Sequence, residues 1–123
     1  MAGATPGPQP YSYKSNWRNR RKSEESVKIG VCVVKLRFPG NGSLKGKRRI
    51  LKSLLARASN KFNISIAEVE DQELWQVSTV GFTCVGNETF YVNQVLSTVV
   101  SFLERSREDA ELLDYEIEII DAL

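Results

Sequence analysis

The sequence predicts an α+β fold in which two helices cover one face of a four-stranded antiparallel sheet. Four segments have the period-two apolar pattern of strands, and two longer segments place apolar residues at the i, i+3, i+4 spacing of amphipathic helices. They follow one another in the order β-α-β-β-α-β, which is the order of a ferredoxin-like sandwich. With 123 residues, the chain has room for one such domain and a tail.

The first strand is expected at residues 27–38 and the first helix at residues 44–61. Pro39-Gly40 ends the strand, and Ser43 precedes the helix, so we expect its hydroxyl to cap the first turn. The helix has one apolar stripe for the core. Its members are Leu44, Leu51, Leu54, Leu55, Ala58 and Phe62.

The second half of the chain is expected to supply strands at residues 63–69, 74–85 and 113–120 and a helix at residues 88–105. Because the fourth strand should flank the first, its acidic side chains are predicted to neutralise basic ones on the uncovered sheet face. The predicted pairs join Glu116 and Glu118 to Lys35 and Arg37.

Two parts are predicted, a disordered arm over residues 1–26 and a folded domain over residues 27–123. The arm contains Pro and Gly without apolar periodicity, and it interleaves aromatic with basic residues. Such a composition suits unpaired bases and phosphates, but a solvated, solubilising tail is the favoured interpretation for a short basic arm. The candidate contacts are Tyr13, Trp17, Arg18, Arg20 and Arg21.

Composition lowers the expectation of catalysis. The chain has no histidine, which removes the commonest general base and the commonest zinc ligand. Cys32 and Cys84 lie in apolar runs and are expected to be buried free thiols. No run is long enough to span a membrane, and no signal peptide is evident. We therefore expect a cytoplasmic, non-enzymatic protein without catalytic residues, metal or cofactor.

Charge is segregated along the chain. Residues 35–61 contain nine Lys or Arg and no acid, whereas residues 62–123 contain thirteen acids and two Arg. On the first helix, Lys45, Arg48, Arg49 and Lys52 share an arc of about 100°, and Lys47, Arg57 and Lys61 lie on the opposite flank. The four residues of the arc, with Gly42 and Ser43, are the predicted binding site for phosphate groups or other anions.

Other sites are less favoured. The loop lacks the nucleotide-binding spacing, since five residues separate Gly40 from Gly46 and no hydroxyl residue follows Lys47. Hydrolysis of acyl phosphates is not expected either, because the loop before the first helix contains no Arg.

Four acids lie near the predicted turn between the second and third strands, and they are Glu68, Glu70, Asp71 and Glu73. Such a group can bind a metal or act in acid–base chemistry, but a solvated turn with Glu68 paired to the basic helix is favoured. Trp75 is expected to be an anchor at the edge of the core rather than a stacking platform.

Residues 36–76 contain a series of distinctive motifs, which are Phe38-Pro39-Gly40, Ser43-Leu44-Lys45, Lys47-Arg48-Arg49, the segment 62–69 and the segment 72–76. With these motifs, the chain resembles the YlxP-like family of small bacterial proteins, a domain of unknown function. The resemblance extends loosely to residues 112–116. It implies a ferredoxin-like domain, and the family's gene neighbourhood implies a role near the ribosome or RNA. Family members often have Glu where this chain has Gly46, so one capping interaction is expected to be absent.

The sequence therefore predicts a non-enzymatic RNA- or ribosome-associated binding protein, with RNA or a ribosomal subunit as its partner. The alternative is a homo-oligomeric interaction module or a sensor of small ligands. Under this alternative, a homodimer would form through the uncovered sheet face, where Val33, Val77 and Thr79 are candidate contacts.

Overall fold

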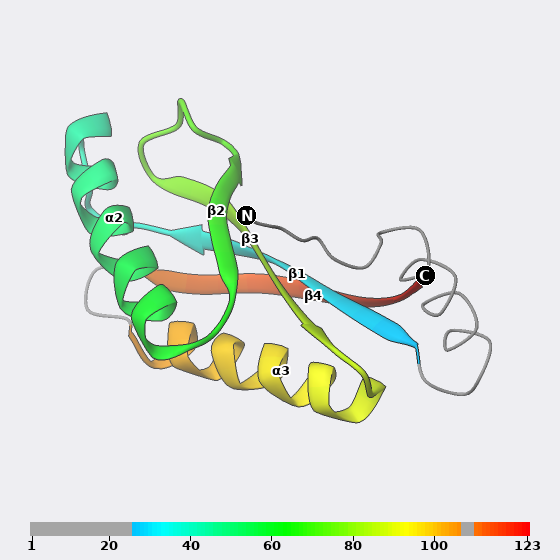
Figure 1. Ribbon diagram of the computed structural model, residues 1–123. Helices are drawn as coiled ribbons and strands as arrows, with labels where there is room; N and C mark the ends of the chain where they lie inside the picture. The colour runs from blue at the N-terminus through cyan, green and yellow to red at the C-terminus, as the bar shows by residue number, and fades with distance from the viewer. Residues whose placement is uncertain (1–25, 107–109) are drawn as a thin grey trace, which may run out of the picture.

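A single four-stranded antiparallel sheet with both helices on one face organises the computed structural model, which describes residues 26–106 and 110–123 (Figure 1). The elements are β1 (Val27–Arg37), α2 (Leu44–Lys61), β2 (Ser65–Glu70), β3 (Val77–Gly86), α3 (Thr89–Arg105) and β4 (Glu111–Ala122). The strand order is β2-β3-β1-β4. The predicted ferredoxin-like α+β fold is confirmed, although β3 begins later than predicted because residues 71–76 belong to the turn before it.

The core lies between the sheet and the two helices. Its strand residues alternate along β1 and β3, and its helix residues follow the predicted stripes. Fully or nearly buried members include Cys32, Val34, Leu36, Val80, Phe82, Leu51, Leu54, Val92, Leu96 and Val99. Cys32 and Cys84 are both buried and unpaired, as predicted, and burial raises the pKa of the Cys32 thiol to about 11.

Close packing of α3 on β1 depends on Gly30. A Cβ atom at this position would lie 2.4 Å from Val92 Cγ1 and 2.7 Å from Leu96 Cδ1. Because both neighbours belong to the buried face of α3, any larger residue would force the helix away from the sheet.

The opposite face of the sheet is uncovered, and its register differs from the one predicted. Glu116 lies opposite Val33, and Glu118 lies opposite Val31. Lys35 and Arg37 do form ion pairs, but with Asp71 at 2.8 Å and with Glu111 at 2.6 Å. The predicted partners were wrong because an alternating pattern fixes the face of each residue and leaves the register open.

Thr79 is also unavailable as an apolar contact on this face. Its side chain is buried, and its hydroxyl donates a hydrogen bond to Asp71 Oδ2 at 2.6 Å. Val33 is 39% exposed and Val77 is partly buried.

Neither helix in the described residues combines the length and apolarity that a membrane crossing requires.

Candidate nucleic-acid interface

The N-terminus of α2 is capped by Ser43, as predicted. Ser43 has an extended backbone, and its hydroxyl accepts a hydrogen bond from Gly46 N at 2.9 Å. No acidic residue lies in the first turn of α2, so the positive end of the helix dipole is not compensated within the helix.

The basic face of α2, which we define as Lys45, Arg48, Arg49 and Lys52, is exposed to solvent. Among residues 26–106 and 110–123, these four side chains form no ion pair with an acidic residue. By contrast, the strand cations Lys28, Lys35 and Arg37 are each paired. The structure thus brings the four predicted residues together on one surface whose charge is available to an outside anion. Gly42 is exposed in the loop before them.

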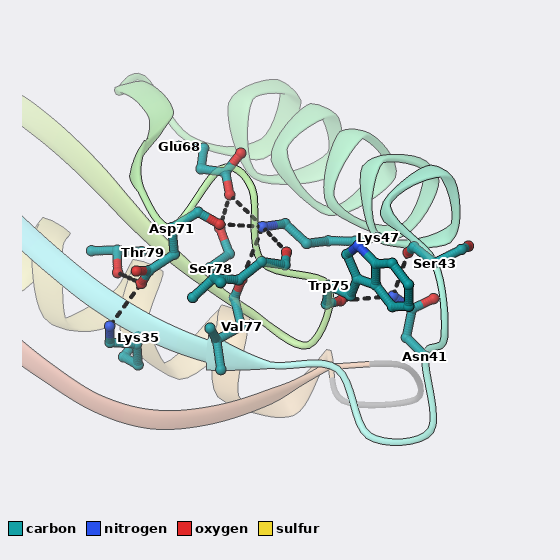
Figure 2. A network of polar contacts seen from close by, with 11 residues as sticks. Lys35, Asn41, Ser43, Lys47, Glu68, Asp71, Trp75, Val77, Ser78 and Thr79 are labelled. Carbon is teal, nitrogen blue, oxygen red and sulfur yellow. Dashed lines mark hydrogen bonds and ion pairs between the residues drawn. The ribbon is translucent and has the colours of Figure 1, made fainter.

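Lys47 belongs to a different environment although it lies between these residues in sequence. Its side chain is buried, and its ammonium group donates hydrogen bonds to the carbonyl oxygens of Asp71 at 2.7 Å and Leu74 at 2.7 Å (Figure 2). It also donates to Val77 O at 2.9 Å and forms an ion pair with Glu68 Oε2 at 2.9 Å. Lys47 therefore fastens α2 to the turn between β2 and β3, and it is not a ligand-binding cation.

Two acids at this turn, Glu68 and Asp71, are engaged within the fold. Glu68 pairs with Lys47, as predicted, and accepts a hydrogen bond from Ser78 Oγ at 2.7 Å. Asp71 has a φ of 66°, and its carboxylate accepts hydrogen bonds from Lys35 and Thr79. These bonds, that of Lys35 first, lower the pKa of Asp71 below its usual value. Within the described residues, no three acidic or cysteine side chains are grouped as metal ligands.

The loop before α2 is joined to the segment before β3. Asn41 Nδ2 donates hydrogen bonds to Ser43 O at 2.8 Å and to Trp75 O at 2.7 Å. Gln76 Nε2 donates to Asn41 O at 3.1 Å, and Phe38 N donates to Gln76 O at 2.8 Å. These bonds hold residues 74–76 beside the capped end of α2 (Figure 2).

Trp75 does not anchor the core. Its side chain lies at the same end of α2 as Ser43 and Asn41, and the residue is 54% exposed (Figure 2). Its neighbour Leu74 is 50% exposed. The prediction that Trp75 anchors the edge of the core was wrong. Lys47 and Asn41 hold the backbone of this segment, and these contacts fix the main chain without covering the indole.

Gly46 is part of the same arrangement. It is buried, and a Cβ atom here would lie 2.3 Å from Asn41 Oδ1 and 3.0 Å from Ser43 Oγ. A glutamate at this position therefore requires Asn41 to move. Gly46 therefore leaves Asn41 free to donate its hydrogen bond to the carbonyl oxygen of Trp75.

A hollow of about 540 Å³ lies at the other end of α2. Its wall includes Phe62, Ile64, Cys84, Tyr91 and Val95, with Lys61 as its basic residue. Burial raises the pKa of the Cys84 thiol, so this group is protonated at neutral pH and is not an activated nucleophile.

The predicted contacts of the N-terminal arm lie outside the described residues. They are Tyr13, Trp17, Arg18, Arg20 and Arg21.

Comparison with known proteins identifies the family of this chain. The profile of a family described as "Protein of unknown function (DUF503)" matches residues 29–117. The chain belongs to the DUF503 family. A relative, "Uncharacterized protein YlxP" of Bacillus subtilis (strain 168), is 40% identical over 76 residues, which are 62% of this chain and 83% of the relative. Among solved structures, "De novo designed protein Foldit4" is similar with a TM-score of 0.47 and 7% identity, over 79% of this chain and 99% of that one.

Replacing Lys47 with Met should lower the free energy of unfolding by about 3–5 kcal/mol, because Glu68 and the turn carbonyls would lose their buried cation. Urea unfolding measures the change. Lys45→Met is the matched control on the exposed side of the same helix and should change stability by less than about 0.5 kcal/mol. An equally mild effect of both substitutions would contradict the structural role of Lys47.

Gly46→Ala should destabilise the protein despite the higher helix propensity of Ala, because the new Cβ would displace Asn41. In an Asn41→Ala background, the same substitution should be less destabilising, since only Ser43 Oγ, at 3.0 Å, still lies close to the new Cβ. A double-mutant cycle by thermal unfolding measures this coupling. Equal effects in both backgrounds would show that the two positions are independent.

Proposed function

We propose that this DUF503 protein is a non-enzymatic RNA-binding protein that associates with the ribosome through the basic face of α2. The observation that supports this proposal is that some cations of the fold are paired with acids, whereas those of the basic face are not. Lys28, Lys35, Arg37 and Lys47 are paired within the fold, whereas Lys45, Arg48, Arg49 and Lys52 are exposed and form no ion pair with described residues. Retaining four adjacent cations on one helix surface favours a polyanion as the partner.

The basic face is suited to backbone phosphates rather than to reading bases. Its four cations extend over about two turns of helix, and the first turn contributes free backbone N–H groups and an uncompensated dipole. Contacts of this type give affinity and orientation without direct sequence recognition. Their strength falls with salt, because each phosphate contact releases bound counterions.

Trp75 favours RNA with unpaired bases. More than half of this residue is exposed. Its carbonyl oxygen accepts a hydrogen bond from Asn41, which lies two residues before the cap of α2. Base stacking on an exposed aromatic ring tolerates any sequence, but it requires a base that is not already stacked in a duplex. A phosphate-binding surface beside the exposed indole of Trp75 therefore suits binding to single-stranded RNA.

The chemistry of the remaining groups supports a binding role without catalysis. Histidine is absent, burial raises the pKa of both cysteine thiols, and hydrogen bonds lower the pKa of Asp71. These are conditions that disfavour an activated nucleophile or a general acid near neutral pH.

The double substitution Arg48→Glu/Arg49→Glu should weaken binding to ribosomal RNA or 30S subunits several-fold and reduce the salt slope by about 1.4 for two lost single-strand contacts. Fluorescence anisotropy across a salt series measures both quantities. Arg57→Glu/Arg105→Glu is the matched control, since it makes the same change of charge at exposed positions away from the basic face. Equal losses in the two variants would leave only a nonspecific effect of net charge and would contradict the proposed site.

Replacing Trp75 with Ala should weaken binding to unpaired RNA by about 1–3 kcal/mol, because one stacked base is lost, and should change binding to a duplex much less. Trp75→Phe, which retains an aromatic ring, should recover most of the loss. Tyr91→Ala, another half-exposed aromatic on α3, serves as the matched control and should have no effect. Equal losses for duplex and unpaired RNA would exclude stacking as the role of Trp75.

A further inference from the structure

The sheet face opposite the helices is apolar in its centre and acidic at one side. Ile29, Val31 and Val33 of β1 lie opposite Ile120, Glu118 and Glu116 of β4 in the register of the sheet. On the other side of β1, Val69 packs over Gly81 and is half exposed. We call this surface the open face. It combines exposed aliphatic side chains with two carboxylates.

The cations of the open face are already used within the fold. Lys35 pairs with Asp71, and Arg37 pairs with Glu111. Glu116 and Glu118 are exposed and form no ion pair with the described residues. The surface therefore retains unneutralised negative charge beside an apolar centre. A suitable occupant is a segment that is both aromatic and cationic.

A second copy of the folded domain fits this surface poorly. A two-fold dimer places the same patch of each copy against the other, so Glu116 and Glu118 would meet a surface whose cations, Lys35 and Arg37, are both paired. Like charges at such a contact oppose association. Charge therefore favours a basic segment over a homodimer of open faces.

The chain itself contains a segment with the required composition. Residues 11–22 include three aromatic and five basic residues and no acid. They are Tyr11, Tyr13, Trp17, Lys14, Arg18, Arg20, Arg21 and Lys22. This segment leads into β1, whose first residue Val27 lies opposite Ala122 of β4. At up to about 3.3 Å per residue, the 25 residues before Ser26 exceed the length of the 11-residue β1.

We propose that residues 11–22 dock on the open face of the same molecule. The aromatic rings would cover the apolar residues of β1, and Arg side chains would neutralise Glu116 and Glu118. The arm would then be an intramolecular cover for the sheet rather than a contact for RNA. This inference does not depend on the RNA-binding proposal, because it involves the face of the sheet opposite to α2.

Fluorescence of Trp17 tests the docking directly in the full chain. The chain has two tryptophans, so Trp75→Phe leaves Trp17 as the single reporter. In this background, Glu116→Gln/Glu118→Gln should increase quenching by acrylamide several-fold and shift the emission to the red. The matched control Glu88→Gln/Glu104→Gln neutralises two exposed acids of α3 and its cap, and it should leave Trp17 protected. Protection that is unchanged by dilution supports docking within one molecule.

Three results would overturn the proposal. Equal quenching of Trp17 in the parent chain and in a synthetic peptide of residues 1–25 would show that the arm is undocked. Equal quenching of the two neutralised variants would show that Glu116 and Glu118 do not hold the arm. Protection that disappears on dilution would assign the contact to the arm of a second copy. Circular dichroism of each variant confirms that the sheet remains folded.

Discussion

The buried ammonium group of Lys47 is the interaction on which the rest of the structure depends. It donates hydrogen bonds to the carbonyl oxygens of Asp71 and Leu74 in the turn between β2 and β3 and of Val77 at the start of β3. Burial of this charge is tolerable because Glu68 supplies an adjacent carboxylate. The same contact fixes the rotation of α2 about its axis. With Lys47 directed at the turn, Lys45, Arg48, Arg49 and Lys52 are directed at solvent.

Asp71 extends this constraint through the sheet. Its carbonyl oxygen accepts from Lys47 on the side of the helices, while its carboxylate accepts from Lys35 and Thr79 on the open face. The left-handed backbone conformation of Asp71 permits both contacts from one residue. A single turn therefore positions the basic face of α2, the exposed Trp75 and part of the open face.

The sequence predicted the element order, the core and the exposed basic arc because these depend on local periodicity, as in the stripe from Leu51 to Ala58. It separated Lys47 from Lys45 on the helical wheel but did not predict that Lys47 is buried, since its carbonyl partners lie 24 to 30 residues away. The partners of Lys35 and Arg37 depend on strand register and on the turn at Asp71, which no periodic pattern specifies. The exposure of Trp75 likewise results from distant backbone contacts.

Lys47 of α2 is thus a structural cation, whereas Lys45, Arg48, Arg49 and Lys52 form the surface that we propose binds RNA. NMR of the lysine side-chain ¹⁵N–¹H₃ groups, recorded with and without RNA, tests this division in one measurement. The Lys47 ammonium should exchange slowly with solvent and should not respond to RNA, whereas Lys45 and Lys52 should exchange rapidly and change on binding. Rapid exchange at Lys47, or signals of Lys45 and Lys52 that RNA leaves unchanged, would contradict this division.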